Sequence, residues 1–223
     1  MPTRAEKVRV WDPFVRIFHW TVVAGFFIAY FTEGEGDVEL LHVWAGYTVG
    51  AMVLLRILWG FFGPRHARFA DFVTAPGTGL RYLVSLATFR AKRHLGHSPA
   101  GGWTVLLLLV GLLATVGAGM ATYGEQGHGP LAPLFAPGAA APQSTSVPRP
   151  ASLSIIPAAR ADDDDDGDRR EGRRRKSSFK EIHELFGNLM LFLIILHVAG
   201  VVLASIAHRE DLVGAMFTGR KKP

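Results

Sequence analysis

One apolar stretch constrains this chain more than any other: residues 180–208, with the sequence KEIHELFGNLMLFLIILHVAGVVLASIAH. It is long and apolar enough to cross a bilayer as a single helix. It also carries His183 and His197, which are fourteen positions apart. At 3.6 residues per turn this spacing is close to four turns, so both imidazoles leave nearly the same face, about 21 Å apart. Titratable side chains are costly in lipid, so two on one face indicate a function.

The composition favours a small integral membrane protein over a soluble domain. Of 223 residues, 49% are hydrophobic and only 19% are charged. The chain has no cysteine, which excludes disulfides, thiolate metal sites, iron–sulfur clusters and haem attached through thioether bonds. The net charge is +5. Because the basic residues cluster in a few segments, they indicate topology and contact with anionic lipid, not nucleic-acid binding.

Three further apolar segments are expected to span the membrane, at about Val15–Phe31, Leu40–Phe62 and Trp103–Tyr123. The basic N-terminus leads into the first of them. No small-x-small cleavage site follows, so we expect an uncleaved membrane helix and not a signal peptide. A basic loop, Arg65–Gly102, joins the second and third segments. Within it, Gly79–Ala91 is typical of a short amphipathic helix on the membrane surface.

The chain therefore divides into residues 1–123, with three membrane helices and a cytoplasmic loop at 65–102, a linker at 124–178, and residues 179–223, with the fourth helix and a cytoplasmic tail. The linker is rich in Pro, Ala and Ser and then reads ADDDDDGDRREGRRRKSS. It cannot bury enough apolar surface to offset its ordering entropy, so we expect a disordered extracytoplasmic segment. A calcium or partner site on the aspartates is the alternative to a solvated linker.

Basic residues in the short connections predict the topology. The N-terminus, the 65–102 loop and the C-terminal tail are basic, whereas the turn between the first two segments carries only acids. The positive-inside rule then gives four crossings with both termini in the cytoplasm. The basic run Arg173–Lys176 is the one feature against this topology.

This topology sorts four histidines into two depths. His42 and His183 fall near the outer face and form the outer pair; His19 and His197 fall near the inner face and form the inner pair. Two neutral imidazoles from facing helices suit the axial ligation of a haem iron. Zinc usually needs three or four ligands at one point, which two histidines per level do not provide. A histidine that is buried and hydrogen-bonded, without a ligand, is the alternative for each position taken alone.

Other residues support these sites less specifically. Arg16 and Arg56 fall at the depth of the inner pair, where they would neutralise haem propionates or extend to the inner interface. Gly46 and Gly187 each follow an outer-pair histidine by one turn and allow a flat ring, or another helix, to approach closely. The remaining histidines are expected to lie on the surface: His66, His94, His97, His128 and His208.

Eight motifs resemble the bacterial cytochrome b561 family, which is related to the cytochrome b subunits of nickel–iron hydrogenases and formate dehydrogenases. They cover nearly all of the chain outside the linker, and their combination is specific: WDPFVRIFHW, LHVWAGY, RILWGFFGPRHARFADF, HLGHSPAGG, YGEQGHGPLA, IHELFGN, LHVAGVVLAS and HREDLVGAMFTGRKK. The linker is longer and more biased in composition than the family pattern, which leaves the outer-face partner open.

The resemblance implies an all-α fold: an integral membrane four-helix bundle with two b-type haems between its helices. The axial ligands that it implies are His19, His42, His183 and His197, the same four that depth selects. Members of the family transfer electrons between the quinone pool and a partner, commonly a c-type cytochrome or a redox enzyme subunit. The implied location is the bacterial cytoplasmic membrane.

We therefore expect a diheme cytochrome b that transfers electrons across the cytoplasmic membrane, in contact with lipid and quinone. Whether it also acts as a quinone oxidoreductase enzyme, or forms a homo-oligomer, is left open. One alternative is a membrane anchor subunit of a hydrogenase-type enzyme. Another, of a different class, is a haem-free histidine transporter or metal-ion carrier, although the repeats or broken helices common in transporters are not found.

Overall fold

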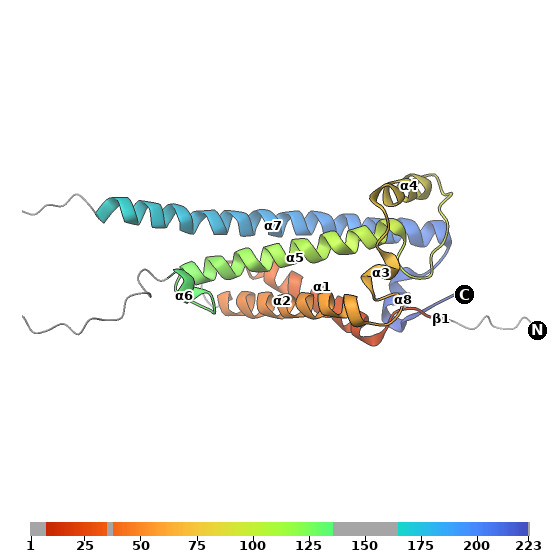
Figure 1. Cartoon of the computed structure of the whole chain (residues 1–223), viewed down its shortest axis with the longest axis horizontal. Coiled ribbons are helices and arrows are strands. Elements are labelled where there is room, and N and C mark those ends of the chain that lie inside the picture. The colour runs from red at the N-terminus through yellow and green to blue at the C-terminus, as the bar shows by residue number, and fades with distance from the viewer. Residues whose placement is uncertain (1–7, 35–37, 136–164, 223) are drawn as a thin grey trace, which may run out of the picture. The chain divides into compact units, whose positions relative to one another are not determined.

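The computed structural model describes residues 8–34, 38–135 and 165–222, with the backbone alone over 165–177. Its elements in chain order are β1 Val8–Arg9, α1 Pro13–Phe31, α2 Glu39–Phe62, α3 Phe69–Phe72, α4 Pro76–Ala87, α5 Pro99–Glu125, α6 Ala132–Phe135, α7 Asp165–His208, α8 Leu212–Thr218 and β2 Arg220–Lys221 (Figure 1). The chain divides into two compact units, residues 1–116 with 184–223 (the first unit) and residues 117–183 (the second unit). Helices α5 and α7 each pass from one unit into the other.

Four helices are long and apolar enough to cross a membrane: α1, α2, α5 and the Ser178–His208 part of α7. The four apolar helices expected from the sequence are thus confirmed in the described part of the chain. Helix α5 begins at Pro99 and not at Trp103, because proline is favoured in the first helical turn. The Ser98 hydroxyl also accepts a hydrogen bond from the Gly101 backbone N–H at 3.1 Å.

Helix α7 begins at Asp165, well before the apolar run. We expected residues 124–178 to lack regular structure, and over 165–178 the backbone differs from that expectation. The reason is local, because this segment is rich in Arg, Glu and Lys, which are strong helix formers. The expectation also differs over residues 124–135, which contain the end of α5 and helix α6. Residues 136–164 of the expected linker lie outside the described residues.

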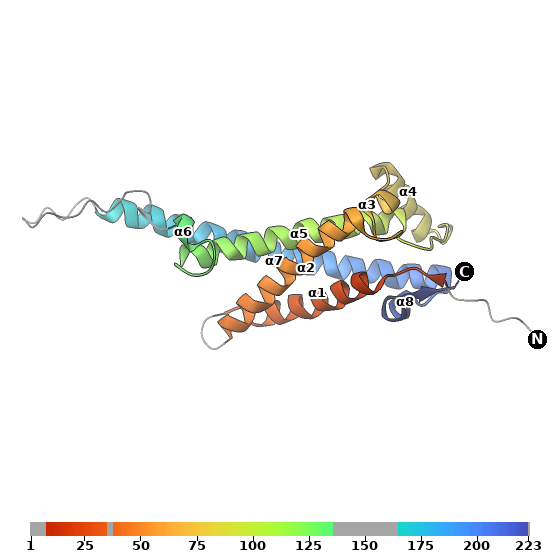
Figure 2. The same cartoon turned by 60° about the horizontal axis from the view of Figure 1, so that its bottom comes forward.

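The larger of two buried apolar clusters in the described part of the first unit joins four helices. It joins Phe26 of α1, Val53 of α2, Leu109 of α5 and Met190 of α7, and Val53 and Met190 are almost completely buried. Helices α1 and α2 pack against each other (Figure 2). Gly111 of α5 lets the Met190 thioether approach the α5 backbone, since a Cβ there would collide with Sδ. Small residues of this kind are what allow membrane helices to approach closely.

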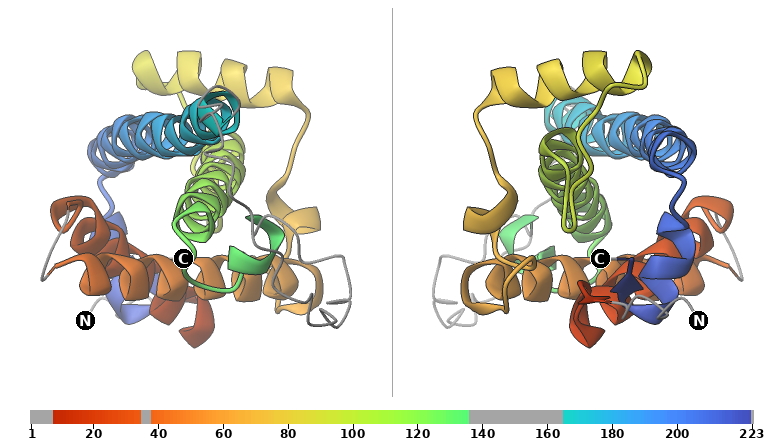
Figure 3. Two further views of the ribbon diagram at one scale, coloured as in Figure 1. Left: turned by 90° about the vertical axis from the view of Figure 1, so that its left-hand side faces the viewer. Right: turned by 90° about the vertical axis from the view of Figure 1, so that its right-hand side faces the viewer.

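The connection between α2 and α5 folds over the bundle in two helices. Helix α3 lies against the backbone of Gly102 and Gly60. Helix α4 runs crosswise to α5 and α7 (Figure 3). It buries Tyr82 on one side and exposes Leu80 and Val84 on the other. The amphipathic helix expected over Gly79–Ala91 is therefore confirmed over Pro76–Ala87, and its contact with the membrane surface stays a prediction.

Both ends of the chain meet on the first unit. Strands β1 and β2 pair antiparallel, with Val8 opposite Lys221. The backbone N–H groups of Val10 and Trp11 donate to the Gly219 carbonyl at 2.9 and 3.2 Å. Gly219 ends α8 with φ +74°, and a Cβ there would come within 2.8 Å of the Trp11 carbonyl oxygen. A left-handed residue without a side chain is thus required at this junction.

A buried ion cluster holds the C-terminal strand. The Glu210 carboxylate, 7% exposed, binds Arg93 Nη2 at 3.0 Å and Lys221 Nζ at 3.4 Å. Lys221 Nζ also donates to the His94 carbonyl. Burial alone would raise the pKa of Glu210, but the hydrogen bond from Arg93 and the charges of Lys221 and Arg93 together lower it. The tail therefore docks through a carboxylate that stays ionised.

The second unit contains the C-terminal end of α5, α6 and the start of the described part of α7. Phe135 of α6 meets Phe179 of α7 edge to face at 5.9 Å between ring centroids. Gly124 of α5 allows α6 to approach, because a Cβ there would meet Leu131 and Phe135 at 3.0 Å. His128 stacks on Tyr123 at 5.2 Å.

Substitutions at two glycines distinguish the effect of close packing on stability from the effect of helix propensity. A Cβ at Gly102 would meet the Phe72 carbonyl oxygen at 2.6 Å, whereas one at Gly77 of α4 would meet nothing within 4 Å. We expect Gly102→Ala to destabilise the protein by about 1–3 kcal/mol through overpacking. Gly77→Ala should be neutral or slightly stabilising, as alanine is the better helix former. Thermal unfolding in detergent micelles measures both, and equal effects would contradict the packing at Gly102.

The ion cluster predicts an acid-sensitive tail. The pKa of the Glu210 carboxyl is lowered on folding. The stabilisation that its ionised form contributes is therefore complete at pH values above the ordinary pKa of about 4.5, and is lost as the pH falls through the pKa of the folded state. Glu210→Gln leaves Lys221 buried without its anion and should cost about 3 kcal/mol or more at pH 7. The control is Asp71→Asn, which breaks an exposed pair with Arg68 worth less than about 1 kcal/mol. Unfolding melts at pH 7 and pH 4 compare the variants.

Candidate functional site

Both residues of the predicted inner pair lie in the first unit. His19 lies on α1 and His197 on α7, both partly buried, and they are close enough for a charge on one imidazole to affect the other. His19 Nδ1 is buried and has no hydrogen-bond partner among the residues that the structure describes. Two imidazoles from different helices, one with an unused buried nitrogen, are a donor set suited to a metal held between them.

Arg56 of α2 is also buried in the first unit, with only 2% of its surface exposed. Its Nη2 donates to the Ala67 carbonyl at 3.0 Å, and its guanidinium carbon lies 5.3 Å from the centre of the Phe69 ring. The negative charge of Asp12, the N-cap residue of α1, interacts with the Arg56 guanidinium. Nη1 is buried and unpaired within the described residues. A buried cation with an unused donor is costly, so it indicates an anionic ligand.

Arg16 presents a second unused donor. It lies on α1 just before His19, and its Nη2 donates to the Phe217 carbonyl of α8. Its Nε is buried without a partner in the part of the chain that the structure describes. Phe217 also stacks on Trp20 at 4.1 Å between ring centroids. Helix α8 thus holds the first turns of α1 and leaves one Arg16 donor available.

His97 lies in an environment that the sequence reasoning did not predict. We expected it on the surface, whereas the residue is only partly exposed and its ring packs between Trp11 at 4.7 Å and Phe72 at 4.4 Å. Its Nδ1 is buried and lacks a partner among the described residues. The charges of Arg56, Lys221 and His197 reach it. Among the described residues, five buried side-chain nitrogen atoms lack a hydrogen-bond partner, on Arg16, His19, Trp20, Arg56 and His97.

This set fits a haem better than a bare ion. The inner pair offers two imidazoles, and Arg16 and Arg56 offer charged donors that match the carboxylates of haem propionates. Within the described residues no group of three or more His, Cys, Asp and Glu is arranged to hold a metal ion. The unused donors thus match an acidic ligand, with its metal bound by two imidazoles.

The outer-pair residues lie in different units. His42 of α2, in the first unit, shares a hydrogen bond through Nδ1 with the Ala29 carbonyl of α1 at 2.8 Å. If Nδ1 carries the hydrogen, Nε2 keeps the lone pair that a metal needs. At Gly46 a Cβ would meet nothing within 4 Å, so there is open space one turn from His42.

His183 of α7 belongs to the second unit, where it lies against the α5 backbone. A Cβ at Gly119 would come within 2.8 Å of the His183 ring, so only glycine allows this approach. The pairing of His183 with His42 stays a prediction. At Gly187, on the first-unit side of α7, there is open space as at Gly46.

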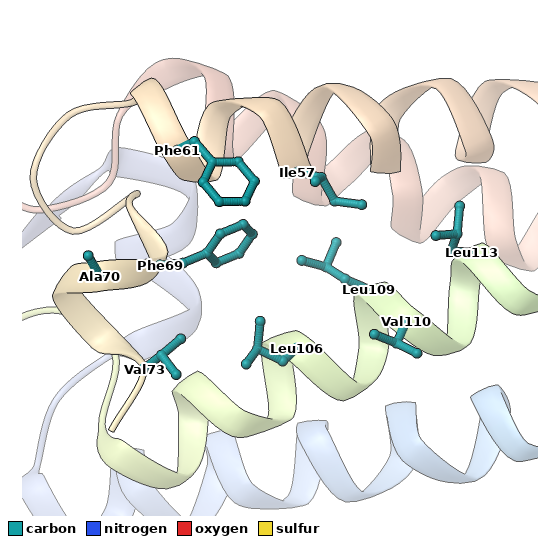
Figure 4. Close-up of a pocket in the computed structure, with 9 residues that line it drawn as sticks. All are labelled: Ile57, Phe61, Phe69, Ala70, Val73, Leu106, Leu109, Val110 and Leu113. Carbon is teal, nitrogen blue, oxygen red and sulfur yellow. The ribbon is translucent and has the colours of Figure 1, made fainter. Parts of the chain in front are cut away.

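An apolar groove of about 450 Å³ opens on the first unit near Arg56. Figure 4 shows its lining side chains, which come from α2, α5 and the segment around α3: Ile57, Phe61, Phe69, Ala70, Val73, Leu106, Leu109, Val110 and Leu113. Every one of these is apolar, as suits an acyl or isoprenoid chain. Phe69 contributes to the groove and also contacts the Arg56 guanidinium, so it stands between the groove and the buried donors.

The sequence matches the family model for prokaryotic cytochrome b561 over residues 10–219. The chain belongs to the prokaryotic cytochrome b561 family. A cytochrome b binds haem b, so membership agrees with the donor set described above. Membership together with the four apolar helices makes the chain a multi-pass membrane protein.

Curated relatives carry a more specific name. The chain is 28% identical over 148 residues to a probable Ni/Fe-hydrogenase B-type cytochrome subunit of Rhizobium leguminosarum bv. viciae, covering 54% of this chain and 61% of the relative. It is 31% identical over 158 residues to a probable Ni/Fe-hydrogenase 1 B-type cytochrome subunit of Escherichia coli K12, covering 57% and 64%. The chain thus spans less than two thirds of these relatives. No solved structure matches it.

The position of His97 was not predictable from local sequence. The residue stands just before the proline that begins α5, in the motif HLGHSPAGG that contributed to the family resemblance. That motif is the only sequence signal for it. Its contacts with Trp11 and Phe72 join three segments that are distant in sequence.

Substitution of Arg56 tests whether its unpaired donor binds a ligand, because the expected effect differs between haem-free and haem-loaded protein. Arg56→Met should leave the stability of haem-free protein unchanged or raise it, because a buried and partly unpaired cation is removed. In haem-loaded protein the same change should weaken haem retention by about tenfold to a hundredfold, since a charge-assisted hydrogen bond of about 1.5–3 kcal/mol is lost. The control is Arg65→Met, at an exposed arginine. Haem per chain and thermal melts are the readouts, and equal effects with and without haem would contradict a ligand contact.

Proposed function

We propose that the protein is a membrane diheme cytochrome b that transfers electrons across the bacterial cytoplasmic membrane. The observation that supports the proposal is the proximity of His19 and His197, in a unit where Arg16 and Arg56 also carry buried donors without a partner among the described residues. When bound, haem supplies one-electron exchange between ferric and ferrous iron. Membership of the cytochrome b561 family supports the same cofactor.

The chain's residues have distinct roles in this proposal. His19 and His197 hold the inner haem, and His42 and His183 hold the outer one. Arg16 and Arg56 neutralise propionates of the inner haem. Because His183 and His197 are fourteen residues apart on one helix, the levels they define are separated by about 21 Å along α7. The apolar helices exclude water from the path between the two levels.

The proposed orientation places both termini in the cytoplasm. The basic segments at the N-terminus, at 65–102 and in the tail support it, as does the acidic turn after α1. In this orientation α4 lies at the cytoplasmic surface, where its exposed leucines face lipid and its flanking arginines meet anionic headgroups.

The proposed partners are the quinone pool and a redox protein such as a c-type cytochrome. The apolar groove beside Phe69 supports a chain-bearing ligand from the membrane. The alternative is the anchor subunit of a hydrogenase-type enzyme, favoured by the names of the relatives. A tagged protein purified in mild detergent distinguishes them, because an anchor retains a hydrogenase large subunit and a free cytochrome does not. The same preparation shows whether the protein is a homo-oligomer.

A haem-free transporter or metal-ion carrier is the alternative from another class. It would need a site for its cargo, and the described residues contain no cluster of three metal-ligating side chains. A purified carrier would lack a Soret band, and metal analysis would return another ion in place of iron. Absorption spectra together with metal analysis therefore separate the two classes.

Four substitutions test the ligand assignment. The wild type should show reversible Soret and alpha bands in a dithionite-reduced minus oxidised spectrum, and two haems per chain by pyridine hemochrome assay. His19→Ala and His197→Ala should remove the same haem, and His42→Ala and His183→Ala the other, because each iron loses one of two axial ligands. His128→Ala, at an exposed position, is the control and should keep both. A folded wild type without these bands would refute the proposed function, and loss of the inner haem in His183→Ala would refute the pairing.

A further inference from the structure

His97 lies where three parts of the first unit meet. Trp11 comes from the segment before α1, Phe72 from the end of α3, and His97 itself from the loop before α5. The Trp11 ring meets the imidazole edge to face and the Phe72 ring lies tilted against it, so the side chain is held on two sides. Such packing positions the nitrogen atoms instead of leaving them to rotate.

The environment of His97 keeps its imidazole neutral. Burial lowers its pKa to about 3, and the charges of Arg56, Lys221, His197 and His66 act in the same direction. Lys221, in β2, is itself paired with Glu210, which follows α7. A neutral imidazole carries one N–H and one lone pair, so it can donate a hydrogen bond without adding a cation.

The buried nitrogen of His97 needs a partner that the described residues do not supply. Nδ1 is buried and makes no hydrogen bond, as is also true of Arg56 Nη1 and Arg16 Nε. An unpaired buried donor costs about 1–3 kcal/mol, so three in one region indicate a ligand with several acceptor oxygens. Two haem propionates offer four such oxygens. Single hydrogen bonds from the Arg16 and Arg56 guanidinium groups would occupy two of them, which leaves acceptors for His97.

We propose that His97 donates a hydrogen bond from Nδ1 to a propionate of the inner haem, and thereby positions that haem and raises its midpoint potential. The inference rests on the proposed function, because it requires a haem at the inner pair. A donor at a propionate withdraws electron density from the macrocycle and offsets part of the carboxylate charge. Both effects favour the ferrous state, so removing the donor should lower the potential.

The test uses full-length protein with both haems bound. His97→Phe keeps an aromatic ring between Trp11 and Phe72 but removes the donor, whereas His97→Gln keeps an N–H donor. The matched control is His94→Phe, which changes the exposed histidine three residues earlier in the same loop. Optical redox titration gives the midpoint potential of each haem, and the His19→Ala spectrum identifies which one is inner.

We expect His97→Phe to raise the ferric-to-ferrous ratio of the inner haem about tenfold at a fixed potential, which corresponds to a decrease of about 59 mV for a one-electron couple. The outer haem should not change. His97→Gln should recover most of the shift, and His94→Phe should resemble the wild type. An unshifted inner haem in His97→Phe, or an equal shift in the Gln variant, would overturn the proposal.

Two further outcomes are distinguished by the same preparations. If the wild type binds no haem, the proposed function fails and this inference fails with it. If both haems bind and the midpoint potential of the inner haem does not change on substitution of His97, only the inference fails. Should His97→Phe not fold, redox-difference infrared spectra of wild type with ¹⁵N-labelled histidine replace it. A redox-dependent imidazole N–H band that disappears in His97→Gln supports the bond, and its absence overturns it.

Discussion

A positive charge buried among apolar helices is the constraint on which the inner part of this structure depends. Arg56 is almost fully buried in α2, where the medium around it screens charge weakly. The chain compensates in part, with the Ala67 carbonyl, the face of Phe69 and the charge of Asp12. The turn after α2 and the short helix α3 are placed by these contacts. The remaining donor defines where an acidic ligand completes the arrangement.

The helices themselves were predictable because their signal is local. Each apolar run that is long enough to span a bilayer is a helix, since lipid offers no partner for unpaired backbone groups. The ends were less accurate: α5 starts earlier at Pro99, and α7 continues back to Asp165 through strong helix formers. The predicted topology places His19 and His197 near one face, and both lie in the first unit, where a charge on one imidazole affects the other.

The environment of His97 shows what local reasoning cannot reach. Its position beside a proline in a basic loop is typical of a surface residue, and nothing nearby in sequence indicates burial. Trp11 and Phe72 partly cover it, and they come from the N-terminal segment and α3, which are distant in sequence. Arg16 is similar, because its contact with Phe217 joins residues from opposite ends of the chain. A residue whose function depends on distant contacts leaves little trace in its own segment.

The C-terminal tail has a structural role beyond the topology that its basic residues predict. Lys221 pairs with Val8 across the two strands, is neutralised by Glu210, and contributes a positive charge that His97 experiences. Gly219 and Phe217 meanwhile hold Trp11 and Arg16, the neighbours of the same region. The two ends of the chain, which local patterns describe as flanking segments, therefore close the inner site. Because these contacts join segments from both ends of the chain, the donors of this region are positioned by the completed fold and not by any one helix.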